Sequence, residues 1–384
     1  MVVWPGVIMA IGMVLALGGP GPAWTQSNPP EVNLLGQAVF SKGALKVRNK
    51  EVGGLSGITY DPAQNLYYVI SDDRAQRGPA RFYTLQLDLN QYRFDNNAVT
   101  FTDVTFLTGP NQQPFPRMSL DPEGIAFARS GSLWISSEGE VNLEEKRIYP
   151  PFIREFSLQG RQLQDLPIPQ LFLPQIKDGQ QQAGIRNNLA FESLTLTPNQ
   201  DYLFTATENA LVQDGPASSV TQGSPVRILK YALSTGTVVG SYLYETDPVA
   251  LAPQPASGFS TNGLVELLAL DDQGTRLLAL ERSFSVGLAG TGNTIKLYEV
   301  DLTLASDLQG VESLNAVDQT EFTPAGKRLL LDFNDLGLTP GVDNLEGMTL
   351  GPKLLNGEHS LILVSDNNFS ERQVTQILVL SLLL

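Results

Sequence analysis

Leu345-Glu346-Gly347-Met348-Thr349 is one of five similar phrases in this sequence. Each phrase has an apolar or small residue, then usually Glu, then a short run of residues that favour β-strands. The other copies are Leu55-Ser56-Gly57-Ile58-Thr59, Pro122-Glu123-Gly124-Ile125-Ala126, Phe191-Glu192-Ser193-Leu194-Thr195 and Val265-Glu266-Leu267-Leu268-Ala269. The intervals counted from Ser56 are 67, 69, 74 and 80 residues, which suits a four-stranded blade with long loops. The repeat therefore predicts a β-propeller.

Further strands follow each phrase. The second strand ends in acidic or hydroxyl-bearing residues, and the third alternates between apolar and polar residues. A fourth strand is readable in the first four units, near residues 99–107, 163–168, 237–244 and 328–333. The last unit runs out of chain after three strands, so we expect residues 34–40 to complete it and to close the ring. The sequence predicts an all-β propeller of five four-stranded blades, with six blades as the alternative if an insertion hides a degenerate one.

Composition agrees with one large all-β domain. The chain has 384 residues, of which 42% are hydrophobic, with 35 Gly and 25 Pro for turns. We expect a single propeller domain over residues 30–384. Residues 1–25 carry no charge and hold an apolar run from Val7 to Leu17 before small residues up to Ala23. This segment predicts a signal peptide, with an uncleaved anchor as the alternative, and a domain outside the cytoplasm, periplasmic or secreted.

Several kinds of chemistry are excluded by what the sequence lacks. Without cysteine there is no disulfide, thiolate metal site or cysteine nucleophile. The only histidine, His359, lies in an expected turn of the last blade, and no Gly-x-Ser-x-Gly motif is present, which argues against a Ser-His-Asp hydrolase. A net charge of −15 argues against nucleic acid as a partner. We expect a monomer whose chemistry depends on carboxylates.

The repeated phrase predicts a metal site. The innermost strand of each blade lines the channel of a propeller, so equivalent positions converge on its axis. Four carboxylates that face one another repel and need a cation, and Ca²⁺ suits such a ring because it takes six to eight oxygen ligands at about 2.3–2.6 Å. The alternative is that each Glu bonds exposed backbone N–H groups. The expected ligands are Ser56, Glu123, Glu192, Glu266 and Glu346.

Charged residues at the ends of the second strands should lie at the same rim. Their acids are candidates for outer metal ligands, for general bases that activate water, or for partners of arginine. These acids are Asp72, Asp73, Glu138, Glu208, Glu281 and Asp366. Arg74 and Arg282 follow two of these strands, and Arg186 precedes a turn; each is a candidate for binding phosphate, with a salt bridge as the alternative.

Ordered phrases from Gly53 to Leu380 resemble the bacterial phytase-like, "esterase-like activity of phytase" family. They include Gly54-Leu55-Ser56-Gly57-Ile58-Thr59-Tyr60-Asp61-Pro62, Asp121-Pro122-Glu123-Gly124-Ile125-Ala126 and Val364-Ser365-Asp366-Asn367-Asn368-Phe369. A weaker resemblance is to the calcium-activated nucleotidases, five-bladed propellers whose central calcium is held by Ser and Glu side chains. It implies Ca²⁺ ligands at Ser56, Glu123, Glu192 and Glu346, with Glu266 where that family has Ser.

Two functions follow as expectations. The first is a calcium-dependent hydrolase of phosphate esters, phytase-like or nucleotidase-like, in which metal-activated water attacks phosphorus near the axis. The second is a non-catalytic, calcium-stabilised propeller whose rim loops bind a ligand or a protein partner. Arginine side chains turned toward the acids would favour the first, and a rim with acids alone would favour the second.

Overall fold

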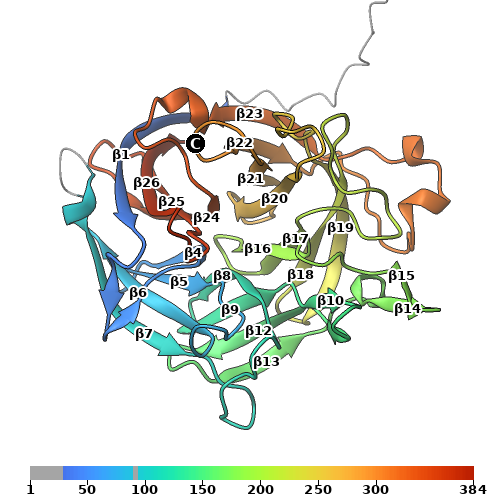
Figure 1. Cartoon of the computed structure of the whole chain (residues 1–384), viewed down its shortest axis with the longest axis horizontal. Helices are drawn as coiled ribbons and strands as arrows, with labels where there is room; N and C mark the ends of the chain where they lie inside the picture. The colour runs from blue at the N-terminus through green and yellow to red at the C-terminus, as the bar shows by residue number, and fades with distance from the viewer. Residues whose placement is uncertain (1–28, 90–93) are drawn as a thin grey trace, which may run out of the picture.

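Five four-stranded antiparallel sheets surround a central axis in the computed structural model of this chain (Figure 1). The structure describes residues 29–89 and 94–384, and within these ranges the helices are short 3₁₀ turns and none is an α-helix. Each sheet is one blade, and the strand formed by the repeated phrase is its innermost strand. The fold is therefore a five-bladed β-propeller, as the sequence predicted, and the six-bladed alternative is not realised.

The blades follow one another along the chain. Blade 1 comprises β4 (Leu55–Asp61), β5 (Leu66–Ser71), β6 (Arg81–Leu87) and β7 (Val99–Phe106). Blade 2 comprises β8 (Pro122–Ala128), β9 (Ser132–Ser137), β12 (Phe152–Ser157) and β13 (Gln162–Leu166). Blade 3 comprises β16 (Phe191–Leu196), β17 (Tyr202–Thr207), β18 (Pro225–Ala232) and β19 (Thr237–Glu245). Blade 4 comprises β20 (Ser260–Ala269), β21 (Arg276–Ser285), β22 (Asn293–Asp301) and β23 (Gly326–Asp332).

Blade 5 joins the two ends of the described chain. It comprises β24 (Leu345–Lys353), β25 (His359–Ser365), β26 (Val374–Leu383) and β1 (Glu31–Ser41), and Figure 1 shows β1 in blue beside β26 in red. Strands β1 and β26 are antiparallel, with Leu34 opposite Leu380 and Phe40 opposite Thr375. The prediction that residues 34–40 close the ring is confirmed, and no edge of β26 is left open.

Short hairpins and 3₁₀ turns decorate the loops between these strands. They are β2 (Lys46–Val47), β3 (Lys50–Glu51), β10 (Glu140–Asn142), β11 (Arg147–Tyr149), β14 (Gln175–Lys177), β15 (Gln180–Ala183), η1 (Asn96–Ala98), η2 (Gln170–Phe172), η3 (Leu314–Ala316), η4 (Gln319–Glu321) and η5 (Phe333–Leu336). No helix within the described ranges is long and apolar enough to cross a membrane. The expected signal peptide at residues 1–25 lies outside the described residues.

The hydrophobic core lies between the blades rather than at the axis. Ile70 of blade 1 and Ile135 of blade 2 belong to one fully buried cluster, and Tyr67 and Ile362 belong to another, between blades 1 and 5. Similar clusters fill the other three junctions. Because apolar side chains hold each blade to its neighbours, the axis is free to carry polar groups.

Candidate metal and phosphate site

A β-bulge near the start of each innermost strand frees one side chain from the sheet. In β24, Leu345 faces Ser365 and Gly347 faces Val364, so Glu346 between them has no partner in the ladder. The pairing of β16 skips Glu192 in the same way. Bulges re-aim side chains, and here they release the second residue of the phrase toward the channel. Ser56 and Glu123 lie in the corresponding irregular parts of β4 and β8.

In the fourth blade the β-bulge lies one residue earlier than alignment of the five phrases on Glu predicts. Leu264 faces Glu281 and Glu266 faces Leu280, so the unpaired residue of β20 is Val265 and not Glu266. Glu266 stands where the other blades have Gly or Ser. Its carboxylate accepts hydrogen bonds from the backbone N–H of Leu194 at 3.1 Å and of Leu267 at 2.9 Å. The structure therefore gives Glu266 the backbone-bonding arrangement that the sequence left as an alternative. The unpaired residue of the bulge, Val265, packs in a hydrophobic cluster.

The second strand of the fourth blade is also shifted by one residue relative to the other blades. Asp366 follows Ser365, the partner of Leu345, whereas Arg282 follows Glu281, the partner of Leu264. The fourth blade thus places a guanidinium where the other blades place the carboxylates of Asp72, Glu138, Glu208 and Asp366. Glu281 lies apart from them. It accepts hydrogen bonds from the Tyr244 hydroxyl at 2.6 Å and from Lys327 Nζ at 2.5 Å.

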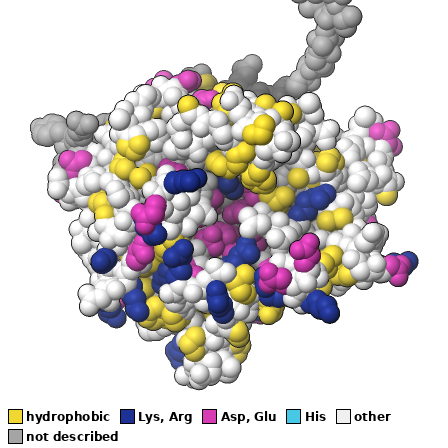
Figure 2. All heavy atoms as spheres, in the orientation of Figure 1, with side chains coloured by type: hydrophobic (Ala, Val, Ile, Leu, Met, Phe, Trp, Pro, Cys, Tyr) yellow, Lys and Arg dark blue, Asp and Glu magenta, His cyan; other side chains and the backbone are white. Residues whose placement is uncertain are grey.

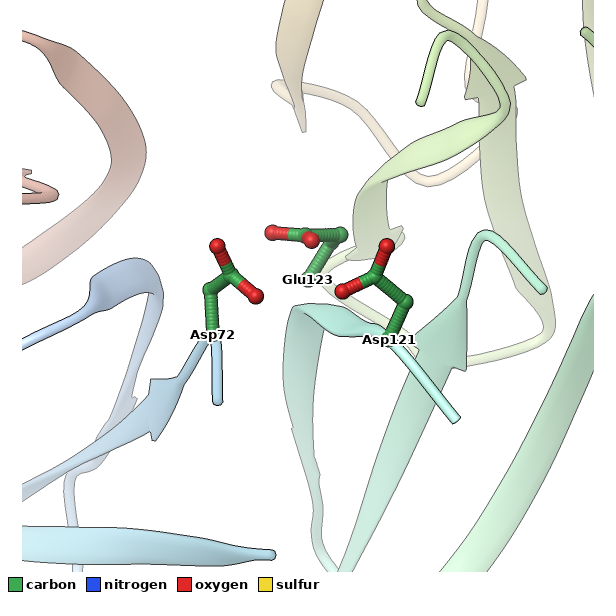
Figure 3. Close-up of side chains that lie close together, drawn as sticks. All are labelled: Asp72, Asp121 and Glu123. Carbon is green, nitrogen blue, oxygen red and sulfur yellow. The ribbon is translucent and has the colours of Figure 1, made fainter. Parts of the chain in front are cut away.

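Carboxylates from neighbouring blades meet in two groups. One carboxylate oxygen each from Asp72, Asp121 and Glu123 lie within 4.8 Å of one another, and Figure 3 shows these three side chains converging. Oxygens of Glu138, Glu192 and Glu208 form the second group at the same spacing. The Ser56 hydroxyl donates to Glu123 Oε2 at 2.6 Å. Most of the predicted metal and catalytic residues therefore lie together, contributed by different blades.

Burial and mutual repulsion raise the pKa values of these acids. Glu123, Glu138 and Glu192 have pKa values well above the usual range, first because they are buried and second because other carboxylates surround them. Burial raises the pKa of Glu346 to about 8, although Arg282 opposes the shift. Burial likewise raises the pKa of Asp366 to about 7. The site therefore favours protons or cations over free negative charge.

Two arginines lie among the acids. Arg282 Nη2 donates to Glu208 Oε1 at 3.1 Å, and its Nε lies 3.5 Å from Glu346 Oε1. Arg74 forms an ion pair with Asp121 and donates to Asn188 Oδ1 at 2.6 Å. The rim is thus not made of acids alone.

Arg186 is not brought to the acids. Its guanidinium donates to the backbone carbonyls of Ala210 at 3.0 Å and Gly215 at 2.6 Å, so it ties two parts of a loop together. Burial without a carboxylate partner lowers its pKa from the usual value.

Asp121 belongs to the site although the sequence did not single it out as a ligand, whereas Asp366 was one of the predicted candidates. Asp121 directly precedes β8, where Asp-Pro reads as a turn signal. Asp366 follows β25 as Asp72 follows β5, so equivalence with Asp72 is the signal that pointed to it.

The donor set fits a hard cation. Figure 2 shows acidic side chains at the bottom of a hollow near the middle of one face, with Lys and Arg side chains around it. The described residues bring eight carboxylates together, all but Asp72 at most 8% exposed, with the guanidiniums of Arg74 and Arg282 against them. Oxygen donors without nitrogen or sulfur suit Ca²⁺ better than zinc. The eight acids are Asp72, Asp121, Glu123, Glu138, Glu192, Glu208, Glu346 and Asp366.

Comparison with solved structures finds matches at low similarity. An endo-arabinase from Bacteroides thetaiotaomicron has a TM-score of 0.41 and 13% identity, covering 87% of this chain and 95% of the other. A luciferin-regenerating enzyme has a TM-score of 0.37 and 11% identity over 92% and 95% of the two chains. A periplasmic gluconolactonase from Pseudomonas aeruginosa has a TM-score of 0.34 and 13% identity over 87% of each. These values carry no argument about activity.

Sequence comparison gives a relative and a family. An uncharacterized secreted protein from Arthroderma benhamiae is 26% identical over 199 residues, which cover 45% of this chain and 36% of that protein's own length. A family model described as "Phytase-like: Esterase-like activity of phytase" matches residues 50–369, which confirms the resemblance carried by the repeated phrases. The chain belongs to this phytase-like family.

Proposed function

We propose that this protein is a calcium-dependent hydrolase of phosphate esters that works outside the cytoplasm. The observation that carries the proposal is the convergence of eight carboxylates and two guanidiniums at one mouth of the channel. Family membership and the description of one relative as secreted agree with it. Phosphate hydrolysis needs both kinds of group, because the acids hold a cation and the guanidiniums bind phosphate oxygens.

The cation site would use acids from several blades. Glu123, Glu192 and Glu346 come from the bulges of the inner strands, and Asp121 and Asp366 lie beside them. When bound, Ca²⁺ would neutralise charge on the phosphate group and polarise its P–O bonds. Because the cation displaces protons from acids with raised pKa values, its apparent affinity should increase with pH.

The arginines are suited to hold the phosphate. Arg282 and Arg74 each use part of their guanidinium on carboxylates, and a guanidinium has five N–H donors in all. Their side chains are 14% and 21% exposed, so solvent reaches both. They therefore remain able to donate to oxygens of a bound ester while staying fixed by the acids.

Asp72 is the proposed general base. It is the one carboxylate of the group that is only half-buried, so water reaches it. Burial and the neighbouring Asp121 raise its pKa, which makes its carboxylate a stronger base than that of a free aspartate. As the water oxygen bonds to phosphorus, Asp72 takes a proton from it and the bond from phosphorus to the ester oxygen breaks. The leaving alkoxide takes a proton from solvent water and departs as the alcohol, and Asp72 returns its proton to solvent. Glu138 and Glu208 are the second choices, since they are buried.

Phosphate release from a panel of phytate, nucleotides and aryl phosphates tests the proposal, with Ca²⁺ and with chelator. We expect turnover with Ca²⁺ only, and a loss of at least about a hundredfold in kcat for Asp72→Asn. Asp165→Asn, on the outer strand β13 and 48% exposed in its side chain, is the matched control and should retain activity.

Absence of turnover on the whole panel would refute the hydrolase. If Ca²⁺ still binds under those conditions, the second function from the sequence, a calcium-stabilised propeller that binds a partner through its rim loops, takes its place. Calorimetric titration with Ca²⁺ on the same samples separates the two cases.

A further inference from the structure

A pocket of about 350 Å³ lies at the outer strands of blade 1, away from the acidic group. Its walls are β3, the loop from β5 to β6, the start of β6, the end of β7 and Phe369 of blade 5. Strand β6 is two strands out from β4, which is about 10 Å at the usual spacing. None of the eight carboxylates lines the pocket, and neither Arg74 nor Arg282 does. A ligand in this pocket therefore occupies a site of its own.

The pocket carries more positive than negative charge, although the protein has a net charge of −15. Three cations line it, Lys50, Arg77 and Arg81, together with one acid, Glu51. Among the described residues only Arg81 of these three forms an ion pair, with Asp73 at 2.6 Å. Three cations against two acids leave one positive charge. This balance suits a ligand with a single negative charge better than a phosphate with two.

Arg81 is held in place with one of its nitrogens left over. Its side chain is only 6% exposed. Nη1 donates to Asp73 Oδ2 at 2.6 Å, and Nε donates to the Tyr83 hydroxyl at 2.8 Å. Nη2 bonds to no acceptor in the described part of the chain, and it is not fully buried. The pocket therefore has a fixed guanidinium with two N–H donors available to a ligand.

Arg77 brings a second guanidinium to the same wall. Its Cζ atom lies 4.7 Å from the centre of the Phe369 ring, and that of Arg81 lies 5.8 Å from the same centre. Two guanidiniums beside one ring repel each other, and an anion between them removes that repulsion. Phe106 on another wall is 37% exposed, so the pocket also offers apolar surface.

We propose that this pocket binds a small organic acid that carries one carboxylate on an apolar body. The carboxylate accepts hydrogen bonds from Arg81 Nη2 and from Arg77, which is the pairing that guanidiniums favour. The apolar body lies against Phe106 and Phe369. This site goes beyond the proposed hydrolase, because it needs neither Ca²⁺ nor any residue of the acidic group.

Calorimetric titration of the whole protein in chelator tests the pocket with phenylacetate, acetate and inorganic phosphate. We expect phenylacetate to bind at least about tenfold more tightly than acetate, because its ring buries apolar surface that acetate lacks. Phosphate should also bind more weakly than phenylacetate, since it has no apolar body and its second charge is not matched.

Variants of Arg77 connect the binding to this pocket. Arg77→Gln should weaken phenylacetate binding at least about tenfold, because a hydrogen bond between charged groups is lost. The side chain is exposed, so the fold does not depend on it. Arg77→Lys keeps the charge without the paired donors and should recover only part of the affinity. Lys177→Gln, exposed on β14, is the matched control and should bind phenylacetate as the unchanged protein does.

Three results would overturn the proposal. They are an absence of phenylacetate binding, equal binding in Arg77→Gln, and phosphate that binds as tightly as phenylacetate. Failure of the hydrolase assay has no bearing on these results, because the titration uses neither Ca²⁺ nor an ester.

Discussion

Glu192 and Glu266 carry the same carboxylate in very different surroundings. Glu192 lies with Glu138 and Glu208 at the mouth of the channel. Glu266 bonds to the backbone of two strands, and backbone hydrogen bonds partly offset the effect of burial on its pKa. The first residue is therefore placed to bind a cation, and the second is placed to join β16 to β20.

Glutamine at these two positions should separate the roles. We expect Glu192→Gln to weaken Ca²⁺ binding about tenfold, because affinity follows the charge of the ligands. Glu266→Gln keeps an acceptor oxygen for the backbone and should change the affinity less than about twofold. Calorimetric titration measures both, and an equal loss in the two variants would contradict the assignment.

Arg282 should matter for stability even without substrate. Its removal as Arg282→Gln leaves Glu208 and Glu346 without their shared cation, and breaking such a buried pair costs about 3–5 kcal/mol. Arg154→Gln removes the surface pair with Asp165 and should cost less than about 1 kcal/mol. Urea unfolding in chelator measures both. A loss in Arg282→Gln no larger than in the control would show that the acids are already neutral.

At the scale of the element, small residues after the ring position let inner strands approach closely. A Cβ atom at Gly57 of β4 would lie 2.6 Å from the carbonyl oxygen of Glu123 and 3.1 Å from the backbone nitrogen of Ile125. These are backbone atoms of β8, which cannot move aside as a side chain would. The ring is therefore narrow at this level, which brings the carboxylates of neighbouring blades together.

Gly57→Ala should destabilise the fold by about 1–3 kcal/mol through this overpacking. Gly341→Ala is the matched control, since a Cβ atom there meets nothing within 4 Å. Thermal unfolding of the two variants gives the comparison. If both melt alike, the inner strands have more room than the contacts at Gly57 indicate.

The repeated phrase predicted the elements better than it predicted the fourth blade. Four copies have a small residue after the ring position, whereas Glu266 is followed by Leu267. Because the five phrases were aligned on Glu, the bulge of the fourth blade was expected at Glu266, one residue after its actual position at Val265. The position of a bulge depends on backbone pairing, which a single sequence does not show. One sequence feature did indicate that the fourth blade differs. The other blades have Ser or Thr directly before the acid that ends the second strand, whereas Arg282 is preceded by Glu281.

The placement of other charged residues could not be predicted from the sequence, for a different reason. Asp121 precedes its strand rather than following one, so no repeat pattern marks it, and only the fold brings it to Asp72. Arg186 and Arg74 look alike in sequence, since both stand near loops of the same rim. The conformation of the loop alone turns Arg186 to backbone carbonyls and Arg74 to Asp121.

For the whole molecule, the acidic group should make stability depend on pH. The folded protein raises the pKa of Asp366 to about 7 and of Glu346 to about 8, against 3.8 and 4.5 for the unfolded groups. At pH values between the unfolded and the folded pKa, folding is therefore accompanied by proton uptake. The resulting contribution to the free energy of unfolding is complete below the unfolded pKa and is lost as pH rises through about 8.

We thus expect the melting temperature in chelator to fall from pH 5 to pH 8. Ca²⁺ should restore it at pH 8, because the cation replaces the missing protons. Melting curves at a series of pH values, with and without Ca²⁺, test this. A flat curve in chelator, or no effect of Ca²⁺ at pH 8, would contradict the prediction.

The pairing of β1 with β26 also governs the order in which this chain assembles. Among the strands of the described residues, β1 is made first and its partner β26 last. Blades 1 to 4 find all their strands within one stretch of chain, but blade 5 has to wait for both ends. Until then β26 has no outer neighbour, and such an open edge invites pairing with other chains. Pairing of β1 with β26 closes this edge, and it therefore protects the newly made protein from aggregation.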